Sequence, residues 1–185
     1  NMRHAKSRLT IHQLVDGQNG KDGLTPQPNL LRDAHLPQHL GAWYKNANNG
    51  GAILYEANIA APVTGAQVWS TEAQARVDCI AELYQNLSVI AGKTYTFSVY
   101  AKGADNGWLI AHPIGTHYEL YIAIPLEETG LANGWRRYAV TFVADKSGST
   151  NVYLRAWYQS RQRKSGKVYF AAPKLEEGRV ATPWL

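Results

Sequence analysis

Tyr153, Arg155 and Trp157 alternate along one short segment, TNVYLRAWYQSR (150–161). Successive side chains of a β-strand point to opposite faces, so these three would share one face while Val152 and Leu154 share the other. Two flat rings beside a guanidinium group form a surface that covers an apolar ligand face and donates hydrogen bonds to a polar rim. We therefore expect this face to bind a ligand.

Two further segments carry a face of the same kind. TYTFSVYAKG (94–103) places Tyr100 and Lys102 opposite an apolar face, and WRRYAVTFVA (135–144) does the same with Arg137. If the three strands lie in one sheet, their outer faces form a single polar and aromatic surface. Aromatic residues in the intervening loops add to this expected surface: Trp43, Tyr44, Trp69, Trp108 and Tyr118.

The sequence thus gives a set of expected ligand-binding residues: Trp157, Arg155, Tyr153, Tyr100, Trp43, Trp108, Tyr118 and Arg137. Each aromatic also has an alternative role in packing, because strands favour Tyr and Trp for their fit to a pleated, half-buried surface. We expect that packing role for Trp135, at a strand start, and for Trp184, after Pro183. The whole face could also be covered by another subunit or by the N-terminal segment.

The sequence carries no convincing catalytic motif. It has no Gly-x-Ser-x-Gly elbow, and Pro37 between His35 and His39 spoils the helix that a zinc-protease His pair requires. The acids Glu127–Glu128 and Glu176–Glu177 are adjacent, so their side chains diverge in a strand, whereas a glycosidase needs two carboxylates facing each other across its site. We expect a protein that is not an enzyme.

The elements that position these residues are expected to be strands. Turn signals such as NNGG, IAGK, ADNG and LANG separate short segments of alternating polarity. The predicted strands are 29–32, 52–59, 66–70, 79–89, 94–103, 107–112, 118–124, 135–144, 151–159 and 167–176. One short helix is expected within 70–78, and 35–50 is expected to be a loop. Many short strands at this spacing favour an all-β jelly-roll sandwich.

Composition limits the class of protein. The chain has 185 residues and a net charge of +5, with six Trp, eleven Tyr and three Phe. The short basic runs 3–8, 135–137 and 161–164 leave nucleic-acid binding as a minor alternative, which we do not favour. The single cysteine, Cys79, lies in an apolar run and is expected to be a buried small hydrophobe. No apolar stretch reaches the length of a membrane helix, so no membrane insertion is expected.

The first 28 residues differ from the rest. Gly17, Gly20 and Gly23 recur at a period of three, with polar residues between them. This segment is interpreted as a flexible linker or as the end of a longer Gly-X-Y stalk. We divide the chain into an N-terminal segment, 1–28, and a β-sandwich domain, 29–185. Since the chain begins Asn1-Met2, we also expect it to be a fragment of a longer protein.

Four segments in order resemble a known family: IAGKTYTFSVYAKG (90–103), GWRRYAVTFVA (134–144), NVYLRAWY (151–158) and GKVYFAAPKLEEGRVATPW (166–184). They are similar to strands of carbohydrate-binding-module-like jelly rolls of the galactose-binding-domain type. The closing PKLEEGRVATPW resembles the end of such modules in bacteriophage and prophage tail proteins. The resemblance implies a non-catalytic glycan-binding sandwich, in which Trp and Tyr lie against sugar rings.

The resemblance also has implications for a structural metal ion, for binding partners and for location. Some family members hold a structural calcium through carboxylates near the two ends of the module, and Asp33 with Glu176 or Glu177 fit that description. No cofactor is otherwise expected. The implied partners are a glycan on a bacterial surface and other tail-protein domains, with assembly as a homotrimer. The implied location is the virion tail or the extracellular space.

The function expected from the sequence is therefore adhesion to cell-surface carbohydrate, as part of a phage or prophage tail. The alternative is a structural module of a tail fibre, whose aromatic face packs against neighbouring subunits.

Overall fold

The computed structural model describes residues 25–103, 107–112, 122–125, 134–159 and 164–184, with the backbone alone at 108–112 and 122–125. Within these ranges every regular element is a strand. The strands are β1 (Tyr44–Asn48), β2 (Ala52–Tyr55), β3 (Val68–Ala73), β4 (Cys79–Val89), β5 (Thr94–Gly103), β6 (Gly107–His112), β7 (Ile122–Pro125), β8 (Arg136–Val143), β9 (Gly148–Tyr158) and β10 (Gly166–Glu177).

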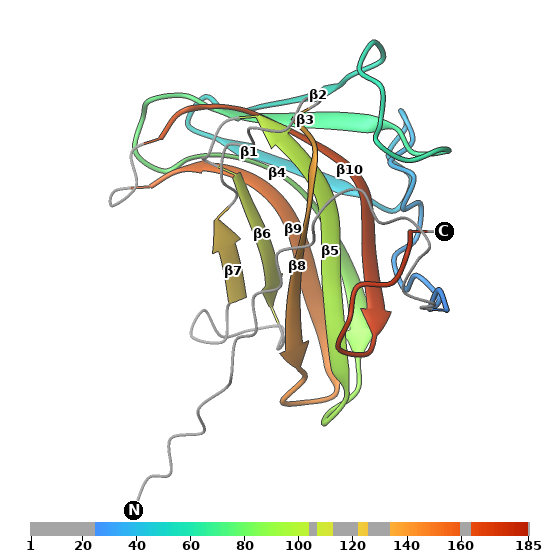
Figure 1. The fold of residues 1–185 in the computed structure, drawn as a ribbon. Coiled ribbons are helices and arrows are strands. Elements are labelled where there is room, and N and C mark those ends of the chain that lie inside the picture. Colours follow the sequence, from blue (N-terminus) through green and yellow to red (C-terminus); the bar gives the residue numbers. More distant parts are fainter. Residues whose placement is uncertain (1–24, 104–106, 113–121, 126–133, 160–163, 185) are drawn as a thin grey trace, which may run out of the picture.

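The strands form two antiparallel sheets that pack face to face (Figure 1). Sheet A has the order β1-β4-β9-β6-β7, and sheet B has the order β2-β3-β10-β5-β8. Strands that follow one another along the chain often lie in different sheets: β4 belongs to sheet A and β5 to sheet B. The predicted all-β jelly-roll sandwich is confirmed.

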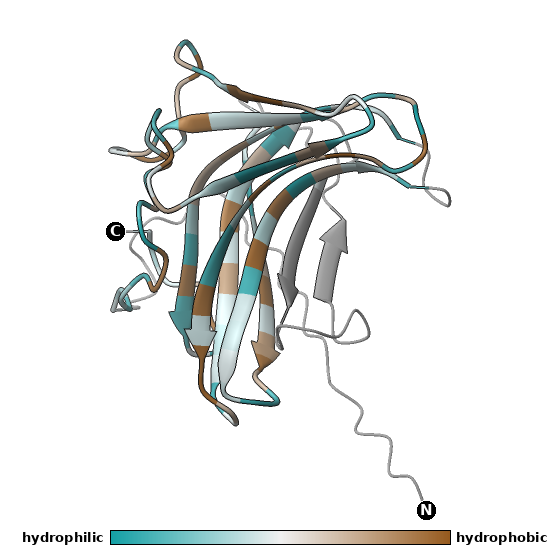
Figure 2. Cartoon of the chain, turned by 180° about the vertical axis from the view of Figure 1, so that it is seen from behind, coloured by the Kyte–Doolittle hydropathy of each residue, from teal (hydrophilic) through white to brown (hydrophobic). Residues whose placement is uncertain are grey.

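Alternation of polarity along the strands builds the core between the sheets. In β9 the side chains of Val152, Leu154 and Ala156 are fully buried, while Tyr153, Arg155 and Trp157 on the other face are partly exposed. Figure 2 shows the alternation as bands of opposite hydropathy along the strands. The inward side chains meet those of sheet B in one core, whose fully buried members include Phe97, Phe170, Leu83, Leu154 and Leu175.

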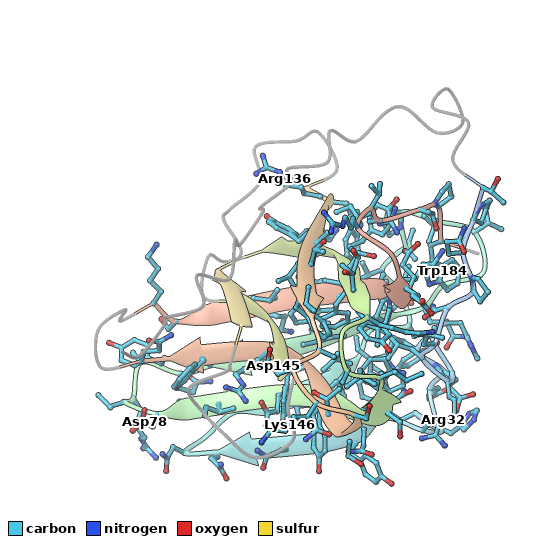
Figure 3. The ribbon with its side chains drawn as sticks, turned by 90° about the horizontal axis from the view of Figure 1, so that it is seen from below. Arg32, Asp78, Arg136, Asp145, Lys146 and Trp184 are labelled. Atoms are coloured by element: carbon cyan, nitrogen blue, oxygen red, sulfur yellow. The ribbon has the colours of Figure 1, made fainter. Side chains whose placement is uncertain are left out.

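The outer face of sheet B is covered along much of its length. In β5 every residue from Tyr95 to Ala101 is buried, on both faces of the strand. A second apolar cluster lies on the outer face, formed by Val68, Tyr100, Trp135, Ala171 and Ala172 with Ile59, Val63 and Trp184 packed against it. Trp184 lies beside the C-terminal end of β10 (Figure 3). The predicted packing roles of Trp135 and Trp184 agree with this placement.

Buried charges fasten the C-terminal segment to sheet B. Lys174 Nζ donates to Thr182 Oγ1 and to the Pro183 carbonyl, both at 2.8 Å, and lies 3.7 Å from Glu176. Arg137 donates to the Thr182 carbonyl at 2.7 Å. Burial lowers the pKa of Lys174, and the carboxylate of Glu176 opposes that shift. Because buried charges need partners, these bonds tie Thr182 and Pro183 of the C-terminal segment to sheet B.

The N-terminal end of the described chain also contacts Thr182 and strand β10. Gln27 N donates to Thr182 Oγ1 at 3.0 Å, and Leu30 N donates to the Leu175 carbonyl at 2.7 Å. Residues before Asn29, the predicted first residue of the domain, therefore contact the sandwich. Arg32 and Trp184 lie on the same side of the molecule (Figure 3), so the described chain enters and leaves on one side.

Several sequence predictions of local structure are wrong. Residues 29–32 do not form a strand; the chain turns there, and Asp33, Leu36 and Leu40 take left-handed backbone angles. No helix lies within 70–78, because β3 continues to Ala73. The expected loop over 35–50 contains β1, an edge strand. The predicted ranges 79–89, 94–103 and 107–112 are confirmed as β4, β5 and β6.

Candidate functional site

The candidate site lies on the outer face of sheet A. The predicted strand and alternation of β9 are confirmed, and Tyr153, Arg155 and Trp157 lie together on that face. In the antiparallel pairing with β4, Tyr153 is opposite Tyr84, Arg155 is opposite Glu82, and Trp157 is opposite Ile80. Directly opposed residues share a face, so two rows of side chains cross the strands.

The first row consists of three tyrosines on three neighbouring strands. Tyr44 of β1 pairs with Tyr84 of β4, which pairs with Tyr153 of β9. Ring centroids lie 5.4 Å apart for Tyr44 and Tyr84 and 5.6 Å apart for Tyr84 and Tyr153, with interplanar angles of 27° and 31°. The first pair is stacked and the second is tilted, and both centroid distances lie in the range of favourable aromatic pairs. Tyr44 lies on the edge strand and is 57% exposed, so this row ends in an accessible ring.

The second row is polar and lies next to the first. Asn46 Nδ2 donates to Glu82 Oε1 at 2.9 Å, and Arg155 Nε forms an ion pair with Glu82 Oε2. The side chains of Arg155 and Glu82 are 12% and 5% exposed. Glu82 thus has both oxygens bonded. The two bonds hold the carboxylate in place between β1 and β9.

Arg155 holds the aromatic rings of its own strand apart. Its guanidinium carbon lies 4.9 Å from the ring centroid of Tyr153 and 5.2 Å from that of Trp157. Cation–π contacts of this kind stabilise a guanidinium between rings. The predicted role of Arg155 was ligand contact. Its small exposure and its bond to Glu82 instead suit a residue that positions Tyr153 and Trp157.

Amide side chains flank the tyrosine row on its other side. Asn86 Nδ2 donates to Asn151 Oδ1 at 3.2 Å, and Asn151 Nδ2 donates to the Tyr153 hydroxyl at 3.1 Å. Burial raises the pKa of Tyr153, and the hydrogen bond from Asn151 opposes that shift. The phenol is therefore neutral at physiological pH. It presents an uncharged polar group beside the rings.

The face continues onto β6 and β7. Trp108 pairs with Arg155, and Ile110 pairs with Tyr153, so backbone register puts Trp108 in the same row as Glu82. Pro125 of β7 is opposite Trp108. The predicted site residue Trp108 thus takes a register position beside the other members of the site. Tyr118, the other predicted residue of this region, lies outside the described residues.

The predicted common surface of three strands is wrong. β5 and β8 belong to sheet B, whereas β9 belongs to sheet A, so Tyr100 and Arg137 lie on the opposite side of the sandwich from Trp157. Both are 8% exposed. The Arg137 guanidinium carbon lies 5.6 Å from the Tyr100 ring centroid, and desolvation by burial lowers the pKa of Arg137. The second apolar cluster and the C-terminal segment cover these residues.

Trp43 also lies elsewhere than predicted. Its side chain is 3% exposed and belongs to the main core, and its indole Nε1 donates to the Asp33 carbonyl at 3.0 Å. The Gly- and Asn-rich surroundings suggested an exposed loop. The structure instead turns the neighbouring residue, Tyr44, to the surface. Trp43 has no accessible ring to offer a ligand.

The carboxylates considered for calcium have other partners. Asp33 Oδ2 accepts a hydrogen bond from Ala42 N at 2.8 Å, Glu176 belongs to the buried network with Thr182, and Glu177 pairs with Lys93 at 3.1 Å. Among the residues that the structure describes, no group of three or more His, Cys, Asp or Glu side chains could hold a metal ion.

Sequence reasoning missed Tyr84, Glu82 and Asn46. The signal for the first two was available, because CIAELYQNLSV alternates in the same way as the strand of Tyr153. Asn46 gave no such signal, since it lies in the Gly- and Asn-rich stretch that was expected to be a loop.

Comparisons with known proteins support the fold. No family model matches the sequence, and no curated protein is significantly similar to it. The enzymatically active domain of tailspike protein 4 of bacteriophage CBA120 is similar with a TM-score of 0.63, at 9% identity over 81% of this chain. This chain spans only 21% of that one.

A second solved structure matches over its whole length. TmCBM61 in complex with β-1,4-galactotriose is similar with a TM-score of 0.52, at 12% identity over 82% of this chain and 99% of that one. The protein therefore has the β-sandwich fold found in a carbohydrate-binding module and in part of a tailspike. The described residues include no helix able to span a membrane.

Proposed function

We propose that this protein is a non-catalytic glycan-binding module whose site is the outer face of sheet A. The observation that supports this most directly is the row of Tyr44, Tyr84 and Tyr153 beside the polar row of Asn46, Glu82 and Arg155. The proposal explains why large aromatic residues stand in register on a partly exposed sheet face. It also accounts for the fold shared with TmCBM61.

The chemistry of a sugar ring fits this arrangement. A pyranose has a face of C–H bonds and a rim of hydroxyl groups. The rings of Tyr44 and Trp157 remove the apolar face from water, while amides such as Asn46 bond the hydroxyls. Tyr and Trp do this at little cost in rotamer freedom. Tyr44 is the main expected contact because it is the most exposed of the three tyrosines.

The two rows also give the ligand a direction. Both cross β1, β4 and β9, nearly perpendicular to the strands, and the tyrosine row ends at the edge strand. A saccharide that follows the rows therefore extends from β9 across β4 and over Tyr44, beyond which sheet A has no further strand. We expect a ligand of several sugar units rather than a single terminal residue.

The biological setting that fits best is adhesion to a bacterial surface as part of a phage or prophage tail. The similarity in fold to a domain of a bacteriophage tailspike supports this setting. Glycan binding by one such face is expected to be weak, on the order of millimolar to micromolar Kd. Repetition of the module on a fibre, for example in a homotrimer, would raise the avidity.

A glycan array probed with the full chain and with Tyr44→Ala tests the proposal. We expect selective binding by the wild type, and its loss in a variant whose melting curve is nearly unchanged. Binding that is equal in the two proteins would move the site away from sheet A. No binding to any glycan would reject the function.

A second function has one observation in its favour. The exposed ring of Tyr44 on an edge strand is also what a subunit contact needs. In that case the module is structural and the face packs against a neighbouring copy. Analytical ultracentrifugation separates the two functions: a trimer that Tyr44→Ala converts to monomers, without glycan binding, supports the structural role.

A further inference from the structure

The charge of the candidate site differs from that of the whole chain. The chain carries a net charge of +5, which by itself favours acidic ligands. On the outer face of sheet A, however, the described side chains include one cation and one anion, Arg155 and Glu82, and these are bonded to each other. The other polar members are amides and phenols, which are uncharged.

The ion pair already balances the charge of Arg155 within the site. Arg155 Nε donates to Glu82, and the guanidinium lies between the rings of Tyr153 and Trp157. A ligand carboxylate that took this Nε bond would have to displace Glu82, whose side chain is 5% exposed and also accepts from Asn46. That exchange leaves one buried carboxylate without its partner, so it is unfavourable.

Three described lysines, Lys45, Lys102 and Lys167, direct their charge away from this face. Lys45 follows Tyr44, but its ammonium group lies 5.9 Å from the ring centroid of Trp69, an inward-facing residue of β3. Lys102 and Lys167 belong to sheet B, where both ammonium groups lie over Tyr169. These three described lysines thus place their charge away from the tyrosine row.

We propose that the site selects an uncharged glycan over an anionic one, and that Arg155 acts there as a positioning residue and not as an anion receptor. This inference rests on the proposed function, since it describes the ligand class of the same face. His112 pairs with Asn151 in register, so the test is run at about pH 8, where histidine side chains are commonly neutral.

The experiment compares glycans that share a backbone and differ in charge. The pairs are hydroxyethyl cellulose with carboxymethyl cellulose, arabinoxylan with glucuronoxylan, and galactosides with their sulfated counterparts. In each pair that binds, we expect the neutral member to bind about tenfold more tightly, with little change when salt screens exposed charges. Preference for the charged member, lost in salt, would overturn the inference and leave glycan binding intact. No binding to any member would reject both.

Glu82→Gln provides a gain-of-function test. The substitution keeps the shape of the side chain but leaves the Arg155 cation without a counter-charge. We expect the charged member of a pair to gain about tenfold in affinity, because a ligand carboxylate can now bond the guanidinium. The double variant Glu82→Gln/Arg155→Gln is the control and must not show that gain. No gain in a folded Glu82→Gln variant contradicts the role of the ion pair, and the wild-type ranking decides the ligand class by itself.

Discussion

The ring of Tyr44 stacks on the ring of Tyr84, with 5.4 Å between centroids and 27° between planes. Tyr44 is on the edge strand β1, and Tyr84 is on the long strand β4 beside it. The contact places an exposed aromatic ring at the end of a row that continues to Tyr153. The candidate site begins at this pair, and removing the outer ring is the mildest way to change it.

Tyr44→Ala is expected to reduce glycan affinity about tenfold. The free energy of unfolding should fall by only about 1 kcal/mol, because the residue is 57% exposed and loses one stacking contact. Isothermal titration calorimetry and urea unfolding measure the two effects. Leu54→Ala is the matched control: Leu54 is 48% exposed on β2, the edge strand of sheet B. Equal losses of affinity in both variants would disprove a site on sheet A.

Trp157→Ala is expected to reduce both affinity and stability. Trp157 is partly buried and its ring packs on the Arg155 guanidinium, so its loss should cost about 2 kcal/mol of unfolding free energy. Binding should fall at least as much as in Tyr44→Ala. Trp157→Phe keeps a ring at this position and should recover part of both losses. A variant that is unstable but binds normally would make Trp157 a packing residue alone.

The ion pair of Glu82 and Arg155 should show strong coupling in a double-mutant cycle. Each single alanine substitution is expected to lower the free energy of unfolding by about 3 kcal/mol, since it leaves a poorly exposed charge without its partner. The double substitution should cost much less than the sum. Denaturant unfolding of the four proteins measures the coupling. Additive losses would mean that the pair contributes little.

Lys174 should give stability a dependence on alkaline pH. Burial lowers its pKa in the folded protein below the unfolded value of 10.5. The unfolded chain then binds more protons between these two values, so the free energy of unfolding rises with pH in that window. Lys174→Met/Glu176→Gln removes both buried charges and should flatten that rise relative to the wild type. The same slope in both proteins would assign it to other groups.

The positions of the strands could be predicted from the sequence better than the order in which the strands pair within each sheet. Alternation in the segment of Tyr153 is a local property, and it identified the face of β9 correctly. Assignment of Tyr100 and Arg137 to the same surface required the sheet order, which no single strand carries. In this sandwich β5 lies between β10 and β8 in sheet B, and a covering segment then buries the outer faces of β5 and β8.

Two neighbouring aromatics show a second limit of sequence reasoning. Trp43 and Tyr44 lie in one Gly- and Asn-rich stretch that lacks the β-branched residues typical of strands. Pairing with β4 makes a strand of residues 44–48, and this tertiary contact decides that Tyr44 faces outward. Trp43 turns inward, where the Asp33 carbonyl accepts its indole proton. Local composition predicts neither the outward position of Tyr44 nor the inward position of Trp43.

Backbone amide and Trp indole chemical shifts, followed by NMR during titration with a glycan that the array identifies, locate the binding face on the protein. We expect the shift changes to concentrate on β1, β4 and β9, with the indole of Trp157 among the affected signals and that of Trp43 unaffected. Shifts concentrated on sheet B, around Tyr100 and Arg137, would contradict a glycan site on the outer face of sheet A.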